Sequence, residues 1–236
     1  MEEKQFEVSF DMRNKLALQM LHVTLPPDFV DKINNFIDGK VENLDVIRQN
    51  SDSKYPPGID LDIGLTEDNQ DVKLLKSTLD TICGEYLRQI GHGDSHVDVF
   101  ESWSILSYAG DYNPLHAHGC QTPAGMSMIL YLKVPKCIEE KPSFPQLHNA
   151  TGDIDGHTGL ITSTNTIHDV YRLKLDAQEY IKPKKGFMII FPNWLQHCVM
   201  PFFGDGERRT MSANFNIRDS KETVAQFKSP TLNKEH

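Results

Sequence analysis

Residues 102–119 read SWSILSYAGDYNPLHAHG, an alternating strand-like run that is followed by two histidines, His116 and His118. One residue separates these histidines, and in an extended strand such residues point to the same side. A second stretch, FPNWLQHCV at residues 191–199, places His197 directly after a short apolar run. Imidazole is a common ligand of iron, zinc, copper and nickel. The three histidines therefore form a candidate metal centre, although they do not by themselves choose the metal.

Short strand-like segments with glycine and proline turns dominate the chain after residue 97. They cover residues 97–108, 124–134, 187–191 and 211–217. Several short strands of this kind are typical of a barrel or a sandwich. Residues 138–183 are rich in turn formers, and we expect them to form loops over the barrel mouth. Residues 221–236 are expected to be a polar, weakly ordered tail.

Residues 1–96 have a mixed pattern that predicts mainly helices outside the barrel. Apolar residues at helical spacing predict one helix over residues 29–37, ended by Gly39, and a longer one over residues 71–90, ended by Gly91. Residues 15–24 are compatible with a strand, and the polar residues 49–71 are expected to be a loop.

The bulk properties describe one globular domain over residues 1–236. Single-domain β barrels often have about 200–250 residues. The net charge of −9 disfavours a nucleic-acid partner, because phosphate binding usually needs a basic surface. The chain has no apolar run long enough for a membrane span and no apolar signal core at MEEKQFEVSF. We therefore expect a cytoplasmic protein without a membrane partner; its oligomeric state is not predicted.

Other histidines compete for a functional role. His92-Gly93-Asp94 spells the His-x-Asp of a common iron site, but it follows the predicted helix end, where turn chemistry explains its glycine and aspartate. His148, His157 and His168 lie in the loop-rich segment and are expected to be loop or surface histidines.

A candidate anion site follows His197. Arg208 lies eleven residues later, which leaves room for a turn over residues 201–206 and a return on the neighbouring strand. Arg208 and Thr210 share a strand face, so a guanidinium and a hydroxyl can hold a carboxylate together. Arg209 is expected to point away, towards the outer surface.

Two tyrosines extend this candidate anion site. Tyr108 and Tyr131 each end or interrupt an apolar strand. A buried phenol needs a hydrogen-bond partner, and the same carboxylate is one candidate. The alternative for each tyrosine is a core aromatic.

Together these stretches resemble the 2-oxoglutarate/Fe(II)-dependent dioxygenases, particularly the prolyl-4-hydroxylase-like branch and its uncharacterised bacterial and phage relatives. The matching stretches are SWSILSYAGDYNPLHAHG, SMILYLKVP, KPKKGFMIIFPNWLQHCVMPF and GERRTMSANFN, within residues 102–216. The resemblance implies a mainly β protein with flanking helices. Its core, at residues 97–220, would be a double-stranded β-helix, or jelly-roll barrel, with the N-terminal helices packed outside.

The resemblance also implies roles for single residues. It places metal ligands at His116, His118 and His197. It places the grip on 2-oxoglutarate at Arg208 and Thr210, in a pocket lined by Tyr108 and Tyr131. Asn214 falls at a recurrent position for which the resemblance gives no role. The implied activity is hydroxylation of an unidentified small molecule or protein side chain with Fe(II), 2-oxoglutarate and O₂, releasing succinate and CO₂.

One departure from the family pattern concerns His118, which stands where the usual triad has Asp or Glu. Two alternatives stay open. A cupin-type three-histidine dioxygenase would need no 2-oxoglutarate, but it leaves Arg208 and Thr210 unexplained. A non-catalytic metal-binding module would bind a metal tightly without producing succinate.

Overall fold

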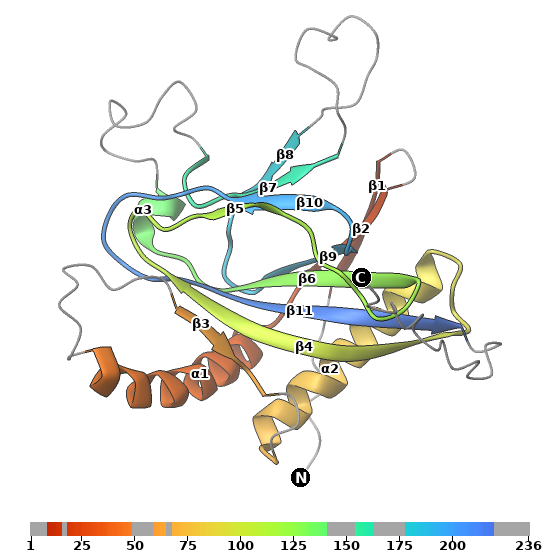
Figure 1. The fold of residues 1–236 in the computed structure, drawn as a ribbon, viewed down its shortest axis with the longest axis horizontal. Helices are drawn as coiled ribbons and strands as arrows, with labels where there is room; N and C mark the ends of the chain where they lie inside the picture. Colours follow the sequence, from red (N-terminus) through yellow and green to blue (C-terminus); the bar gives the residue numbers. More distant parts are fainter. Residues whose placement is uncertain are drawn as a thin grey trace, which may run out of the picture.

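Two antiparallel sheets face each other, and two long helices cover the outer face of the larger sheet (Figure 1). The computed structural model describes residues 9–15, 18–48, 59–64, 68–140, 154–162 and 178–219. Within these residues, no helix is both long and apolar enough to cross a membrane. The predicted tail at residues 221–236 lies outside the described residues.

The larger sheet has seven strands, and every neighbouring pair is antiparallel. In spatial order they are β1 (Ser9–Lys15), β2 (Leu18–Thr24), β9 (Phe187–Pro192), β6 (Ala124–Lys133), β11 (Arg208–Asp219), β4 (Ser95–Ser107) and β3 (Ile59–Asp62). The long strands β4, β6 and β11 lie side by side at its centre and bring segments far apart in the sequence into register.

The smaller sheet has four strands and lies across the barrel interior from the larger one (Figure 1). In spatial order they are β5 (Asn113–His116), β10 (Gln196–Val199), β7 (Thr158–Ile161) and β8 (Gln178–Ile181). A shared apolar cluster joins the sheets, with Ile129 and Phe191 from the larger and Leu160 and Ile181 from the smaller. Two facing antiparallel sheets of this kind form a jelly roll, which confirms the predicted fold class.

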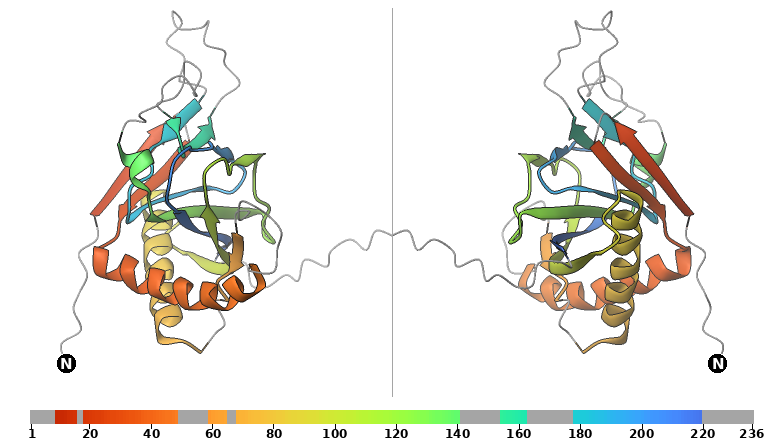
Figure 2. Two further views of the ribbon diagram at one scale, coloured as in Figure 1. Left: turned by 90° about the vertical axis from the view of Figure 1, so that its left-hand side faces the viewer. Right: turned by 90° about the vertical axis from the view of Figure 1, so that its right-hand side faces the viewer.

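The helices α1 (Pro27–Arg48) and α2 (Gln70–Gln89) lie against the larger sheet on the side away from the barrel interior (Figure 2). Asn69 caps α2, since its Oδ1 accepts from the backbone amides of Asp71 and Val72 at 2.7 and 3.3 Å. A short third helix, α3 (Lys136–Glu139), follows β6. Apolar residues of α1 and α2 pack with β6, β9 and β11 into the main core, so the helices close this face of the sheet.

Several predicted boundaries were wrong. The first helix continues past Gly39 to Arg48, because one exposed glycine costs a helix only about 1 kcal/mol and the packing of its buried face offsets that. The predicted loop at residues 49–71 contains β3, and the region 138–183 contains β7 and β8. Strands of four residues are too short for alternation to distinguish them from loops. The strand expected at residues 15–24 is present as β2, which begins at Leu18 and pairs with β1.

Arg209 points away from the barrel interior, as predicted, but it is buried beneath α1 instead of lying on the outer surface. Only 1% of it is exposed. Its guanidinium donates to Asp38 at 2.7 Å, to Glu207 at 2.6 Å and to the Asn34 carbonyl at 3.2 Å. The Arg209 and Lys133 cations lower the pKa of the Asp38 carboxyl, against the raising effect of its burial. These contacts join α1 to the first residues of β11.

We expect Arg209→Met to lower the free energy of unfolding by about 3 kcal/mol, because it leaves two carboxylates without their buried cation. The measurement is urea denaturation. Arg218→Met is the matched control: Arg218 lies on the same strand, but its ion pair with Asp98 is exposed, and its loss should cost less than about 1 kcal/mol. Equal losses in the two variants would contradict the role given to Arg209.

Candidate metal and anion site

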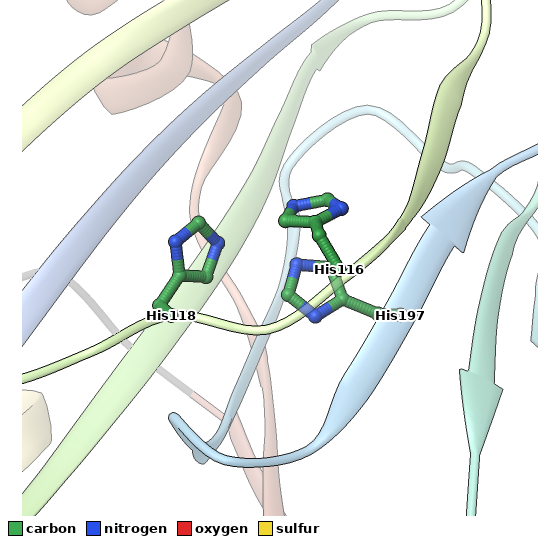
Figure 3. A group of neighbouring side chains, drawn as sticks. All are labelled: His116, His118 and His197. Carbon is green, nitrogen blue, oxygen red and sulfur yellow. The ribbon is translucent and has the colours of Figure 1, made fainter.

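Three histidine side chains converge inside the barrel (Figure 3). His116 ends β5, His197 lies on the neighbouring strand β10, and the two are directly paired across the ladder. The ring centroid of His118 lies 5.0 Å from those of both His116 and His197, which are themselves 4.2 Å apart. One nitrogen of each ring lies within 4.8 Å of the others. Three imidazole nitrogens this close together can act as one facial set of metal ligands.

Backbone carbonyls orient two of these rings. The Nδ1 atom of His116 lies 2.7 Å from the Pro114 carbonyl, and Nδ1 of His197 lies 3.0 Å from the Leu195 carbonyl. A carbonyl only accepts, so each Nδ1 carries a proton, and in the neutral ring Nε2 is the nitrogen with the free lone pair. This is the outer hydrogen bond that metal-binding histidines usually make.

The spacing of His116 and His118 had suggested that both lie on one strand. The structure places only His116 on a strand. The strand β5 ends at His116, and His118 follows in the next segment. Asn193, in the turn after β9, holds it: the Asn193 carbonyl accepts from the His118 amide at 3.0 Å, and the Asn193 side chain donates to the His118 carbonyl at 3.1 Å. The ring also packs against Trp103 of β4, with centroids 5.5 Å apart. A turn thus positions the third histidine.

Burial lowers the pKa of two of the three rings, His118 and His197. Desolvation lowers the pKa of His197 to about 4, opposed by its bond to the Leu195 carbonyl and assisted by His116 and His118. Burial and then His116 lower the pKa of His118, while Glu101 acts in the opposite direction. Neutral imidazole is the form that binds a metal, so these rings need no deprotonation near pH 7.

A cavity of about 500 Å³ joins the histidines to Arg208. All three histidines, Arg208 and Thr210 line it. Sequence reasoning missed other lining residues, among them Trp103, Ile105, Ser107 and Ser212. The alternation of residues 102–108 could have identified the first three, because they occupy every second position of one strand.

Arg208 is a buried cation at this cavity. It is 1% exposed, and its Nε donates to the Gly156 carbonyl at 3.0 Å. Among the described residues, no carboxylate forms an ion pair with it, whereas its neighbour Arg209 pairs with two. Burial lowers the pKa of Arg208, and Tyr131 opposes this. A guanidinium stays charged in proteins, so this buried charge calls for an anion.

Three other residues were predicted for the anion site. Thr210 and Tyr131 lie near Arg208, whereas Tyr108 does not line the cavity. Thr210 lines the cavity beside Arg208. The guanidinium carbon of Arg208 lies 5.4 Å from the ring centre of Tyr131, whose hydroxyl donates to Thr158 at 2.7 Å. Tyr108 is only partly buried, and its hydroxyl donates to Glu207 at 3.3 Å instead of lining the cavity.

The chain crosses between the sheets to connect the two parts of the site. The strand β10, with His197, belongs to the smaller sheet, while β11, with Arg208, belongs to the larger. The prediction of a return on the neighbouring strand was therefore wrong. Gly204 and Gly206 allow the crossing, with φ of 135° and 116°. An added Cβ would come within 2.7 Å of Cys137 at the first and of Pro135 at the second.

The competing histidines lie elsewhere. His92, Gly93 and Asp94 sit in the turn between α2 and β4, and in the described residues the only metal-compatible cluster is that of His116, His118 and His197. His157 is buried instead of lying on the surface; its Nδ1 donates to the Asp155 carbonyl at 3.0 Å. His148 and His168 lie outside the described residues.

Residues 101–215 match the protein family described as "Putative 2OG-Fe(II) oxygenase". Over these residues, just under half of the chain, the sequence is similar to the 2OG-Fe(II) oxygenases. This confirms the resemblance drawn from residues 102–216. An oxygenase of this kind is an enzyme that works with Fe(II), 2-oxoglutarate and O₂. A search among curated proteins finds no match to its sequence.

Solved structures share the fold of the oxygenase. AviO1 from Streptomyces viridochromogenes Tue57 is 12% identical, with 81% of this chain and 86% of that chain covered and a TM-score of 0.56. HygX from Streptomyces hygroscopicus, with nickel and 2-oxoglutarate bound, is 10% identical, with 84% and 82% covered and a TM-score of 0.52. A Pseudomonas putida prolyl-4-hydroxylase is 15% identical, with 82% and 88% covered and a TM-score of 0.49.

We expect Arg208→Met to leave the free energy of unfolding unchanged within about 1 kcal/mol, or to raise it. The substitution removes a buried cation that has no carboxylate partner in the described structure, and such charges are often replaced by apolar residues without loss. Urea denaturation without added ligand tests this beside Arg209→Met. A loss for Arg208→Met as large as that for Arg209→Met would show that Arg208 serves mainly the fold.

Proposed function

We propose that the oxygenase hydroxylates an organic substrate, with Fe(II) bound by His116, His118 and His197 and 2-oxoglutarate anchored by Arg208. The observation that carries this proposal is one cavity with three convergent imidazoles and a buried guanidinium that pairs with no carboxylate among the described residues. The products besides the hydroxylated substrate would be succinate and CO₂.

The donor set fits an Fe(II) ion. His116 and His197 present Nε2 lone pairs, because their Nδ1 atoms are engaged by backbone carbonyls. Three protein ligands on one side of a metal leave positions open for a chelating cosubstrate and O₂. When bound, the metal would supply the oxidising chemistry, and the protein would supply position and electrostatics.

Arg208 and Thr210 would hold the distal carboxylate of 2-oxoglutarate. The Arg208 guanidinium is desolvated and fixed by the Gly156 carbonyl, so little reorganisation is needed when an anion arrives. Thr210 adds a hydroxyl on the same face of β11. Tyr131 would support the guanidinium, because its ring and its hydroxyl both lie against Arg208 while the hydroxyl donates to Thr158.

The substrate would enter the part of the cavity not taken by 2-oxoglutarate. Trp103, Tyr112 and Val199 give it apolar lining, and Asp111 and Asn113 add polar groups. This mixed lining suits a small molecule or a protein side chain. Closure of the cavity around it would exclude water, which strengthens the electrostatic interactions inside.

Anaerobic titration tests the metal and cosubstrate sites together. We expect a weak visible charge-transfer band that needs both Fe(II) and 2-oxoglutarate, and we expect His197→Ala to abolish it. The matched control is His157→Ala, because His157 is also buried and also bonds a carbonyl through Nδ1, yet lies outside the cluster. A full band in His197→Ala would contradict the ligand assignment.

Substitution of Arg208 distinguishes 2-oxoglutarate chemistry from a cupin-type reaction. We expect Arg208→Met to weaken 2-oxoglutarate binding at least 100-fold, because it removes a desolvated, charge-assisted pair worth about 3 kcal/mol or more. The measurements are the thermal shift caused by 2-oxoglutarate and the succinate formed under O₂, with Arg218→Met as control. Metal-dependent oxidation that survives Arg208→Met unchanged would favour the cupin reading, and metal binding without succinate in the wild type would favour a non-catalytic module.

A further inference from the structure

The third histidine of the cluster differs from the other two in its outer contacts. The rings of His116 and His197 each donate through Nδ1 to a backbone carbonyl. In the part of the chain that the structure describes, the His118 ring contacts Trp103, His116 and His197, and no hydrogen bond from it is present. Metal-binding histidines almost always have such an outer partner, and a carboxylate is one of the usual kinds.

A carboxylate lies on the strand face against which His118 packs. Glu101 precedes Trp103 by two residues on β4, so the two share a strand face. The Trp103 ring packs against the His118 ring, which places His118 over this face of β4.

Two buried side chains hold the Glu101 carboxylate in place. Asn214, directly opposite on β11, donates from Nδ2 to Glu101 Oε1. The Oδ1 atom of Asn214 accepts from the Ser127 hydroxyl on β6 at 2.6 Å. Asn214 is 1% exposed and Ser127 2%. A chain of hydrogen bonds across three adjacent strands thus fixes one carboxylate at the barrel end where His118 lies.

We propose that Glu101 is the outer carboxylate of the metal centre, a positioning residue that orients His118 and supplies negative charge near the metal. In this chain His118 stands where the related triad has a carboxylate ligand. Glu101 would supply the missing negative charge from outside the set of metal ligands. The role of Asn214 follows: it holds Glu101 through its amide and is itself held by Ser127. This inference rests on the proposed metal site.

Calorimetric titration of the full chain with Ni(II), without 2-oxoglutarate or O₂ turnover, tests the proposal. We expect Glu101→Gln to raise the dissociation constant for Ni(II) about 10-fold. That is the lower end of the usual effect of losing an outer carboxylate, because Glu101 is exposed to solvent. Glutamine keeps the size of the side chain and the acceptor for Asn214, so the fold should be retained.

Three comparisons separate this role from a structural one. Glu139→Gln removes the same charge at an exposed position on α3 and should change the dissociation constant less than twofold. Glu101→Asp keeps the charge and should lie between the wild type and Glu101→Gln. In a His118→Ala background, Glu101→Gln should have no further effect on Ni(II) binding, because it acts through that ring.

The outcomes that would overturn the inference are distinct from those that would overturn the proposed function. If Glu101→Gln binds Ni(II) like the wild type, or loses no more affinity than Glu139→Gln, Glu101 has no role at the metal. If the loss persists undiminished in the His118→Ala background, it does not act through His118. If the wild type binds no Ni(II), the metal site itself is wrong, and the proposed function fails with it.

Discussion

The two-residue alternation of side chains along β11 is the constraint on which both the fold and the site depend. Residues on one face meet the helices and the main core; those on the other face meet the barrel interior. The core face carries Arg209, Met211, Ala213 and Phe215, and the interior face carries Arg208, Thr210, Ser212 and Asn214. A shift of pairing by one residue would exchange the two sets, so the register with β4 and β6 specifies core and site at once.

The neighbours Arg208 and Arg209 show how differently one strand can use the same residue type. Both are 1% exposed. Arg209 meets two carboxylates and fastens a helix, whereas Arg208 meets a carbonyl, a hydroxyl and an aromatic ring. A buried charge without a counter-charge lowers the stability of the ligand-free fold. It also prepares the site to bind an ion of opposite charge. The three histidines across the cavity have the opposite requirement, because imidazole nitrogens that lie this close together can bind a cation.

Sequence patterns predicted a barrel or sandwich and placed Arg208 and Thr210 on one strand face, because both predictions depend on local periodicity, but they missed cavity residues such as Trp103 and Ser212. The spacing of Arg208 and Thr210 placed them on one face, and the strand before His197 placed that histidine at the barrel. The burial of Arg209 was not predictable, since alternation gives the side of a sheet and not what covers that side. The placement of His118 was also missed, because the Asn193 turn that holds it lies 75 residues away in the sequence. Four-residue strands such as β7 carry too few side chains to show a period.

The crossing from β10 to β11 links the two parts of the site through a single short connection. One end of it carries His197 and the other Arg208, and Gly204 and Gly206 fit it closely against Pro135 and Cys137. The span between the cation-accepting and anion-accepting ends is thus set by the length of one covalent tether. Insertions or deletions in this connection would change the distance between the histidines and Arg208, and with it the length of the molecule that can bind both. Changes in segments outside the barrel would leave this distance unaltered.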